Sequence, residues 1–312
     1  MRKVLFIDSV HPFVEAELLK AGFEVEHDYT SSREEIAEKL SNYYGLIIRS
    51  RFKINKEFLS QPNTLKFIGR YGAGLENIDT DFAESLNINC IRVPEGNRDA
   101  VGEQAIGMLL MLLNNLKRAD AEVRQGIWRR EENRGYEING KTVGILGYGF
   151  MGSAIHEKLQ GFGCHVLVYD KYLKIEDPNV QQVELEVLFE KADIISVHIP
   201  FTEDNKFSLN ESFWAKFKKP IYVINTARGD VLKISDLLDA IEDGKVLGAC
   251  LDVLEFEKSS FENLDSEEQM PPDFVRLINS DRVILSPHIA GWTFESYDKL
   301  AKAMVSKILA LD

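Results

Sequence analysis

Residues 141–170 constrain the fold more strongly than any other part of this 312-residue chain. The apolar run 142–146 is long enough for one buried strand, and Gly147, Gly149 and Gly152 follow it in the spacing G-x-G-x-x-G. An amphipathic segment and a second apolar run then lead to a closing aspartate. Strand, glycine turn, helix, strand and acid in this order are typical of a dinucleotide-binding βαβ unit.

Each part of this unit has a physical role in holding a pyrophosphate. Gly147 permits the tight turn, Gly149 keeps side-chain atoms away from the pyrophosphate, and Gly152 lets helix and strand pack closely. Phe150 and Met151 begin the helix, whose free N–H groups and dipole attract phosphate. The sequence therefore predicts a pyrophosphate site at 147–152, and an ordinary glycine-rich turn is the alternative.

Asp170 indicates which dinucleotide binds. A carboxylate at this position can accept hydrogen bonds from both ribose hydroxyls and would repel a 2′-phosphate, so NAD is expected rather than NADP. Lys171 is the one neighbouring feature that favours NADP, because a cation could bind the additional phosphate. We interpret Lys171 as a solvated surface lysine.

Composition limits the partners. The chain has 37 basic and 50 acidic residues, a net charge of −13, which argues against nucleic acid or an anionic membrane as partner. Its three cysteines, Cys90, Cys164 and Cys250, are too widely spaced for a metal pattern or a disulfide framework. The first ten residues are too short for a signal peptide core or a membrane span. We expect a cytoplasmic protein without a bound metal.

Strands alternate with helices along the chain, which is typical of parallel sheets covered on both faces. The helix expected at 97–116 is apolar nearly all round, so it should be buried between layers or domains. Strands are expected at 3–7, 23–26, 46–48, 66–69, 88–93, 142–146, 164–169, 194–200, 221–226, 247–253 and 283–285. Besides the helix after the glycines, helices are expected at 12–21, 32–40, 55–60, 97–116, 185–190, 212–217, 235–242 and 293–311.

Two loops in the first 95 residues follow strands, where ligands of parallel sheets collect. Arg49 and Arg51 lie at one strand end, and one of them is expected to contact substrate. After the next strand, glycines can present backbone N–H groups to an anion as a nest, with a plain strand–helix turn as the alternative. The residues of that second loop are Tyr71, Gly72, Ala73 and Gly74.

The segment 119–136 is charged and carries Trp128, so it is an arm rather than core. An aromatic side chain in such an arm often marks a subunit contact, and packing within the chain is the alternative.

Later strand ends carry residues suited to hydride transfer. They lie on the sheet edge where Asp170 also stands, and they are His198, Arg228, Asp252 and His288.

At this point the chain resembles the D-isomer-specific 2-hydroxyacid dehydrogenase family over nearly its whole length. The resemblance is carried by RYGAGLENID (70–79), VGILGYGFMGSAI (143–155), VHIPFT (197–202), INTARGDVL (224–232), GACLDVLEFE (248–257) and SPHIAGW (286–292). It implies an α/β fold with a Rossmann cofactor domain inserted in a flavodoxin-like substrate domain, both built on parallel sheets. The substrate domain would comprise residues 1–95 plus 288–312, and the NAD-binding domain residues 96–287.

The resemblance also implies catalytic roles. The arginine of the TARG motif, Arg228, would bind the carboxylate and carbonyl of the substrate, and His288 would be the acid/base. Glu257 would partner that histidine, in preference to the neighbouring Glu255. The family usually has proline after this glutamate, where this chain has Lys258.

Further residues of the family pattern would contact the cofactor or the substrate. Asp252 would hydrogen-bond the nicotinamide carboxamide or adjacent backbone, and the 72–74 loop would bind the substrate carboxylate. Thr226 and His198 would line the cofactor cleft, with a structural role as the alternative for His198. Val101 is expected to contact NAD as well.

The family offers several substrates. Arg49, Arg51 and Arg70 resemble the cations that phosphoglycerate dehydrogenases place near a phosphate, so D-3-phosphoglycerate is expected. A hydroxypyruvate or glyoxylate reductase is the alternative, and an NAD-binding corepressor-like protein is the alternative of another class. The family implies a homodimer acting on a small molecule. No regulatory domain is expected after Asp312.

Overall fold

The computed structural model describes residues 2–257 and 270–311, so Lys258 lies outside the described part. The chain forms two compact units. The outer unit comprises residues 1–98 and 292–312, and the inserted unit comprises residues 99–291. The chain therefore leaves the outer unit once and returns to it near the C-terminus.

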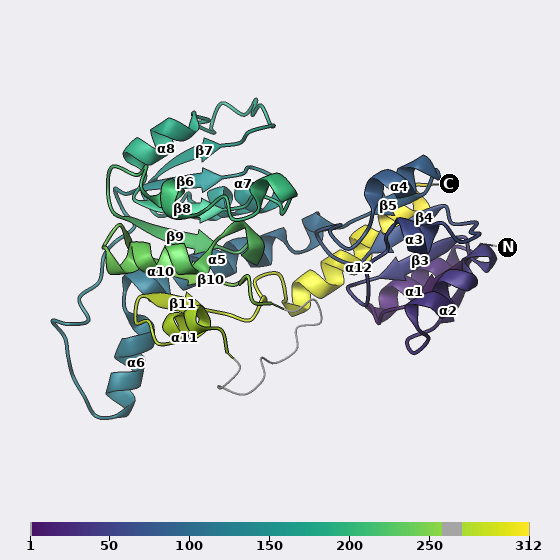
Figure 1. The fold of residues 1–312 in the computed structure, drawn as a ribbon, viewed down its shortest axis with the longest axis horizontal. Helices are drawn as coiled ribbons and strands as arrows, with labels where there is room; N and C mark the ends of the chain where they lie inside the picture. The colour runs from purple at the N-terminus through teal and green to yellow at the C-terminus, as the bar shows by residue number, and fades with distance from the viewer. Residues whose placement is uncertain (1, 258–269, 312) are drawn as a thin grey trace. The chain divides into compact units, whose positions relative to one another are not determined.

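The outer unit is built on a parallel sheet with the strand order β2-β1-β3-β4-β5. This order is that of flavodoxin-like folds, as expected. Figure 1 labels β3, β4 and β5 of this sheet. Successive residues of β1 alternate between two cores, because side chains of a strand point to opposite faces. The strands are β1 (Lys3–Phe6), β2 (Glu24–His27), β3 (Gly45–Ile48), β4 (Phe67–Arg70) and β5 (Asn89–Ile91).

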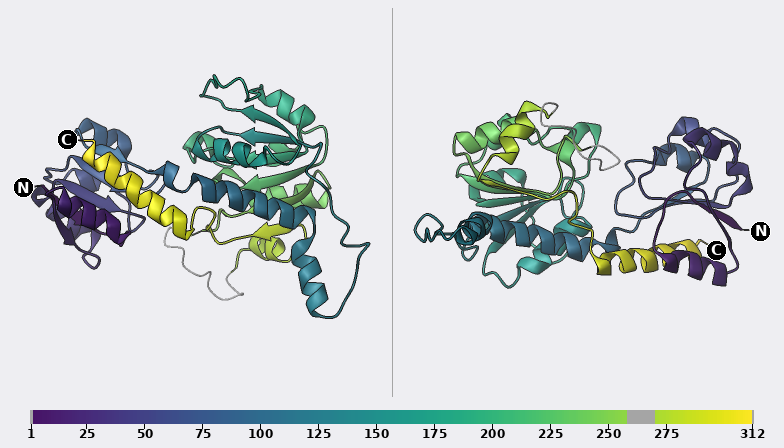
Figure 2. Two further views of the ribbon diagram at one scale, coloured as in Figure 1. Left: turned by 180° about the vertical axis from the view of Figure 1, so that it is seen from behind. Right: turned by 90° about the horizontal axis from the view of Figure 1, so that it is seen from below.

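Helices cover both faces of this sheet. On one face α2 (Arg33–Glu38), α3 (Lys56–Leu59) and α4 (Thr80–Ser85) contribute to one hydrophobic core. On the other face, α1 (Pro12–Lys20) lies beside α12 (Phe294–Leu309), and the two helices share the second core (Figure 2). The C-terminal helix thus completes a unit that begins at the N-terminus.

The inserted unit has a second parallel sheet, in the order β11-β10-β9-β8-β6-β7. An isolated parallel bridge from Val168 of β7 to Gln182 stands where a Rossmann sheet has its outermost strand. The strands are β6 (Thr142–Leu146), β7 (His165–Tyr169), β8 (Ile194–Val197), β9 (Ile221–Asn225), β10 (Val246–Leu251) and β11 (Val283–Leu285).

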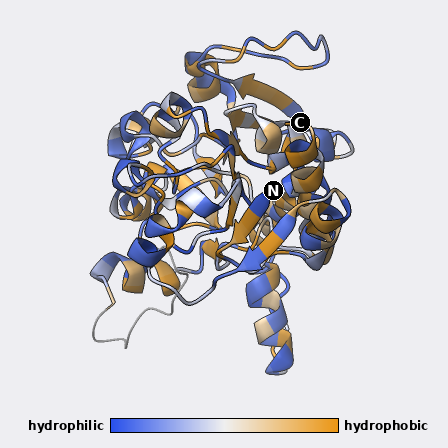
Figure 3. Ribbon diagram, turned by 90° about the vertical axis from the view of Figure 1, so that its right-hand side faces the viewer, coloured by the Kyte–Doolittle hydropathy of each residue, from blue (hydrophilic) through white to orange (hydrophobic). Residues whose placement is uncertain are grey.

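Two helical layers cover the inserted sheet. Helices α5 (Arg98–Leu113) and α7 (Phe150–Leu159) pack on one face, which holds Ile145 and Ile224. The other face packs against α8 (Leu185–Lys191), α9 (Glu211–Trp214), α10 (Ile234–Glu242) and α11 (Pro272–Ile278). In Figure 3 the apolar colours gather on the strands, while α6 (Leu116–Arg124) is mostly hydrophilic and has no buried residue. None of the helices in the described residues is long and apolar enough to cross a membrane.

The helix expected at 97–116 ends earlier, at Leu113. Asn115 takes a left-handed conformation with φ of +50°, which asparagine tolerates, and α6 begins directly after it. The strand expected at 194–200 ends at Val197, where its pairing with Asn225 ends. Helices α4, α6 and α11 were not expected from the sequence.

The boundary expected before His288 is also displaced, because this residue is tied to the inserted unit. Its N–H donates to the carbonyl of Asp252 at 2.8 Å, and the next two N–H groups donate to the Asp252 carboxylate. The division falls after Gly291 instead, and the first crossing falls after Arg98 rather than residue 95.

Candidate cofactor and catalytic site

The glycine turn of the inserted unit has room for a ligand at one position only. Gly147 has a φ of +92°, and a Cβ on Gly152 would lie 2.1 Å from the Gly147 carbonyl oxygen. At Gly149, the N-cap of α7, a Cβ would meet nothing within 4 Å. Phe150 and Met151 form the first turn of α7, whose leading N–H groups have no partner inside the helix. This open helix N-terminus fits a pyrophosphate.

Asp170 follows β7 directly and is held by backbone N–H groups. Its Oδ2 accepts from Tyr148 at 2.7 Å, and its Oδ1 accepts from Tyr172 and Leu173 at 2.9 and 2.8 Å. Burial opposes ionisation of the carboxyl, but these bonds outweigh it and hold the pKa of Asp170 below its ordinary value. The Lys171 ammonium lies 5.2 Å from the Tyr172 ring centroid. Asp170 is therefore a charged acceptor of the kind that a ribose requires.

Two polar atoms just beyond β8 and β9 have no partner among the described residues. They are Nδ1 of His198 and Oγ1 of Thr226, both buried. The other ring nitrogen of His198 lies 2.8 Å from the Ser196 hydroxyl, and burial lowers the pKa of this histidine to about 4. Buried polar groups are ordinarily satisfied, so these orphaned atoms suit a polar ligand at this edge of the sheet.

Val101 lies on α5 and is 5% exposed, so little of its side chain is open to a ligand. Its neighbour Gly102 packs against the backbone of α7, where a Cβ would stand 3.2 Å from the Ala154 carbonyl carbon. This close packing sets α5 against the dinucleotide helix.

Arg228 is positioned by a buried asparagine that sequence reasoning missed. Asn225, the last residue of β9, accepts the Ala227 N–H and donates to the Arg228 carbonyl, both at 3.0 Å. The guanidinium of Arg228 donates to the Ala227 carbonyl at 2.6 Å. The sequence feature that could have revealed this role is the polar Asn225 at the end of an otherwise apolar strand.

Gly229 brings the Arg228 loop against the loop that carries Glu257. A Cβ on Gly229 would stand 2.1 Å from the carbonyl carbon and oxygen of Leu254, so only glycine permits this approach. The Leu254 N–H in turn donates to Oε1 of Glu257 at 2.7 Å. Arg228 and Glu257, two of the residues expected to act in the site, are thereby carried by two loops in backbone contact.

Glu257 and His288 are paired. Oε2 of the glutamate lies 2.7 Å from Nδ1 of the imidazole. Glu255 has a different position, because its Oε1 accepts the N–H of Ile234 at the start of α10. The geometry therefore selects Glu257, and not Glu255, as the partner of the histidine.

The backbone of His288 is unusual and is held by Asp252. Its φ of +54° is left-handed, a conformation that costs energy in a non-glycine residue and often marks a functional site. Asp252 is 1% exposed, and its carboxylate accepts from the Ser286 hydroxyl at 2.5 Å and from the N–H groups of Ile289 and Ala290 at 2.9 and 2.8 Å. Asp252 thus binds backbone N–H groups of the segment that carries His288.

In the outer unit, Asp8 anchors the loop after β3, a role that sequence reasoning missed. Its Oδ2 accepts the N–H groups of Arg49, Ser50 and Arg51 at 2.6, 3.0 and 3.2 Å. The Arg51 guanidinium donates to the carbonyls of three residues, Ile7, Asp28 and Ser31. These bonds give Arg51 a structural environment, whereas Arg49 turns to the Trp292 ring, 4.9 Å away.

The loop after β4 retains two N–H groups without a partner among the described residues, those of Ala73 and Gly74. The Gly72 N–H is occupied, because it donates to the Arg70 carbonyl at 2.8 Å. Tyr71 is 3% exposed and donates its hydroxyl to the Tyr297 carbonyl. The nest expected at 72–74 is therefore reduced to two donors, and the Tyr71 side chain belongs to the core.

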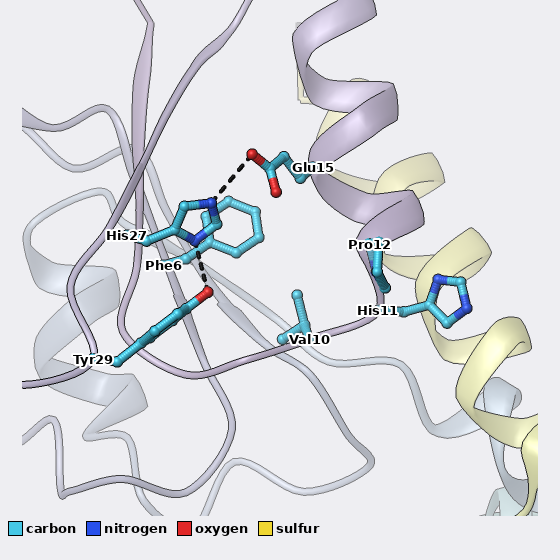
Figure 4. A pocket seen from close by; sticks show the side chains of 7 residues that line it. All are labelled: Phe6, Val10, His11, Pro12, Glu15, His27 and Tyr29. Atoms are coloured by element: carbon cyan, nitrogen blue, oxygen red, sulfur yellow. Dashed lines mark hydrogen bonds and ion pairs between the residues drawn. The ribbon is translucent and has the colours of Figure 1, made fainter.

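A pocket of about 380 Å³ lies at the carboxyl ends of β1 and β2. In Figure 4 the side chains of His27, Glu15 and Tyr29 face one another: His27 lies 3.1 Å from Glu15 and 2.6 Å from the Tyr29 hydroxyl. None of the buried polar side-chain atoms of the residues that line this pocket lacks a partner. The pocket is lined by Phe6, Val10, His11, Pro12, Glu15, His27 and Tyr29.

Comparison with known proteins places this geometry in a family. The model described as "D-isomer specific 2-hydroxyacid dehydrogenase, NAD binding domain" matches residues 106–290. The human D-3-phosphoglycerate dehydrogenase is 33% identical over 302 residues, which are 96% of this chain and 54% of that protein. The chain thus spans about half the length of such relatives. A hydroxypyruvate reductase of Thermotoga maritima is 31% identical over 278 residues, 88% of this chain and 87% of that protein.

Solved structures agree with these matches. A D-2-hydroxyisocaproate dehydrogenase superposes with a TM-score of 0.84 at 26% identity, covering 100% of this chain and 96% of that one. The Aquifex aeolicus D-lactate dehydrogenase, complexed with NAD and lactic acid, has a TM-score of 0.83 at 27% identity and covers 99% and 95%. The chain belongs to the D-isomer-specific 2-hydroxyacid dehydrogenase family, and residues 106–290 form the NAD-binding domain of that family.

Proposed function

We propose that this protein is an NAD-dependent oxidoreductase that acts on the CH–OH group of a D-2-hydroxyacid. The observation that carries the proposal is the Glu257–His288 pair, 2.7 Å apart, within the unit that also holds the open glycine turn and Asp170. NAD, when bound, supplies the hydride acceptor. Gly149 and α7 would hold its pyrophosphate, and Asp170 its ribose.

His288 is the proposed acid/base. When Nδ1–H donates to Glu257, the lone pair of Nε2 is left to accept the proton of the substrate hydroxyl. The Glu257 carboxylate fixes this tautomer and stabilises the imidazolium that results. In the reverse direction the same nitrogen returns the proton to the carbonyl oxygen.

Arg228 is the proposed ligand of the substrate carboxylate and C2 oxygen. A guanidinium offers parallel N–H donors that match a carboxylate, and its charge polarises the neighbouring oxygen. Independently, we propose that the loop after β4 binds carboxylate through the N–H groups of Ala73 and Gly74.

Phosphorylated hydroxyacid is the proposed substrate, with D-3-phosphoglycerate oxidised to 3-phosphohydroxypyruvate. The similarity to D-3-phosphoglycerate dehydrogenases and the cation Arg49 support this choice. A hydroxypyruvate reductase is the second candidate, favoured by the Thermotoga maritima relative, which this chain matches over most of its length.

The substrate is tested by following NADH formation with D-3-phosphoglycerate, D-lactate, D-glycerate and D-2-hydroxyglutarate, and NADH consumption with hydroxypyruvate. Highest kcat/KM for the phosphorylated acid is expected. If D-3-phosphoglycerate is not turned over, or only as well as the other acids, its assignment as the substrate is wrong. Tight NADH binding without any turnover favours an NAD-binding regulatory protein.

We also propose a homodimer formed through the arm. Val123, Trp128 and Tyr136 are 49%, 71% and 61% exposed, so large apolar side chains of the arm lack cover within the chain. Light scattering should give a dimer mass for the native protein and a smaller mass for Trp128→Glu. A native monomer contradicts the assembly.

A cytoplasmic location is proposed as well. Cys90, Cys164 and Cys250 are all free thiols, as a reducing compartment allows. Burial raises the pKa of Cys90 to about 11, so this thiol is protonated at neutral pH and poorly reactive. Localisation of a tagged protein tests the proposal.

A further inference from the structure

Within the described part of the chain, the backbone of Arg49 is held by hydrogen bonds, whereas its side chain is not. Its N–H donates to Asp8 at 2.6 Å, and its carbonyl accepts from the Asn77 amide at 3.4 Å. Among the residues that the structure describes, its guanidinium makes no hydrogen bond and no ion pair. Its recorded contact is the face of Trp292, with the guanidinium carbon 4.9 Å from the ring centroid.

The Trp292 ring in turn packs against other aromatic side chains. Trp292 is 53% exposed, and its ring meets Tyr297 edge-on at 5.5 Å between centroids. Tyr297 in turn meets the buried Tyr71 edge-on at 5.6 Å, and the Tyr71 hydroxyl donates to the Tyr297 carbonyl. A single aromatic cluster of the outer unit therefore supports the indole on which Arg49 rests.

This arrangement leaves the cation available to an anion. A cation over an aromatic face is attracted by the ring without using its N–H donors, so the guanidinium keeps all of them for a ligand. Restricting a long side chain in advance also reduces the ordering cost of binding. Arg51 differs from Arg49, because its guanidinium donors are already hydrogen-bonded to three backbone carbonyls.

We propose that Trp292 is a positioning residue that holds Arg49 for the second anionic group of the substrate, a phosphate monoester or a distal carboxylate. The inference rests on the proposed function and deepens it. In a chain with a net charge of −13, a substrate with two anionic groups needs a cation that is held in place. Trp292 then discriminates between substrates that carry this second group and those that lack it.

The experiment compares Trp292→Leu, which removes the aromatic face, with Trp292→Phe, which keeps one. Steady-state kinetics are measured with D-3-phosphoglycerate, D-2-hydroxyglutarate and D-glycerate. The leucine variant should raise KM for the first two by about two- to five-fold, the range of an exposed cation–π contact, with little change in kcat. D-Glycerate should be unaffected, and the phenylalanine variant should largely restore the native KM.

Phe294→Leu is the matched control. Phe294 is 96% exposed at the start of α12 and has no recorded contact with Arg49, so its loss should leave all three KM values unchanged. An equal change for D-glycerate and for the two acids that carry a second anionic group in Trp292→Leu, or no change for any of them, overturns the inference. A phenylalanine variant as impaired as leucine also overturns it.

Calorimetric titration separates this inference from the proposed function. If no hydroxyacid is turned over, the proposed function fails, but the affinities of D-3-phosphoglycerate and D-glycerate for the protein can still be compared. The inference then requires tighter binding of the phosphorylated acid, weakened selectively in Trp292→Leu. Equal affinities of the native protein for the two acids overturn it.

Discussion

Nδ1 of His288 lies 2.7 Å from Oε2 of Glu257, and the imidazole is presented from a backbone with a φ of +54°. This left-handed conformation is supported by Asp252, whose carbonyl accepts the N–H of His288 and whose carboxylate accepts the next two N–H groups. The position of the proposed acid/base therefore depends on one carboxylate at its ring and on another beneath its backbone.

Replacing Glu257 should impair catalysis without unfolding the protein. In Glu257→Gln the amide can still accept from Nδ1, but it no longer stabilises the imidazolium, so kcat should fall on the order of a hundred-fold or more. Affinity for NADH should remain, as measured by fluorescence titration. Glu255→Gln is the matched control, because its oxygen can still accept the Ile234 N–H; a similar loss there would contradict the assignment of Glu257.

Asp252→Asn should affect both stability and activity. The buried carboxylate accepts three hydrogen bonds, and an amide nitrogen in place of one oxygen leaves a buried donor without its acceptor. Such a loss costs about 1–3 kcal/mol, and the His288 turn should lose its conformation. Urea unfolding and kcat measure the two effects. Unchanged stability together with reduced activity would instead favour direct contact of Asp252 with the cofactor.

His198 should make the protein less stable in mild acid. Burial lowers its pKa to about 4, below the value of an unfolded histidine, so the unfolded chain binds the proton more readily. Stability is therefore full at neutral pH and falls as the pH drops from about 6.5 towards 4, by about 1.4 kcal/mol at pH 5.5.

Urea unfolding at pH 7.5 and pH 5.5 checks this linkage. His198→Asn should lose this part of the pH dependence, whereas His165→Asn, at an exposed strand position, should behave like the native protein. Identical pH dependence in native protein and His198→Asn would contradict it.

Alanine should have different effects at two glycines of the turn: it should weaken NADH binding at Gly149 and lower stability at Gly152. At Gly149 a Cβ meets no atom and φ is −77°, so Gly149→Ala should fold normally but bind NADH more weakly, because the methyl group enters the space of the pyrophosphate. At Gly152 the methyl group would meet the Gly147 carbonyl at 2.1 Å, and stability should fall by about 1–3 kcal/mol. Thermal unfolding and NADH titration distinguish the variants. Undiminished NADH affinity in Gly149→Ala would contradict the pyrophosphate site.

Much of the fold was predictable because parallel strands buried on both faces are continuous apolar runs. The bounds of β6 and β11 agree with those expected. Helix α4 was missed because it is short and its residues TDFAES are largely polar; the Asp79 cap is its clearest sequence signal. The break after α5 depends on the left-handed Asn115, which apolar periodicity does not reveal.

The pairing of Glu257 with His288 could be predicted from motifs, because each lies in a recognisable segment. The supporting contacts could not. Asp8 binds a loop 41 residues later, and Asp252 supports a turn 38 residues later, and both distances in sequence are closed only by folding. The contact of Trp292 with Arg49 joins the two chain segments of the outer unit, so the sequence pattern around either residue does not indicate it.

The proposed activity and the role of His288 are tested most directly by NADH formation from D-2-hydroxyacids by the native protein and by His288→Gln. If His288 is the acid/base, the native protein forms NADH with a D-2-hydroxyacid and none with its L-isomer. The variant then loses at least a hundred-fold in kcat and still binds NADH. Full turnover by His288→Gln, or no turnover of any D-2-hydroxyacid by the native protein, would contradict this proposal.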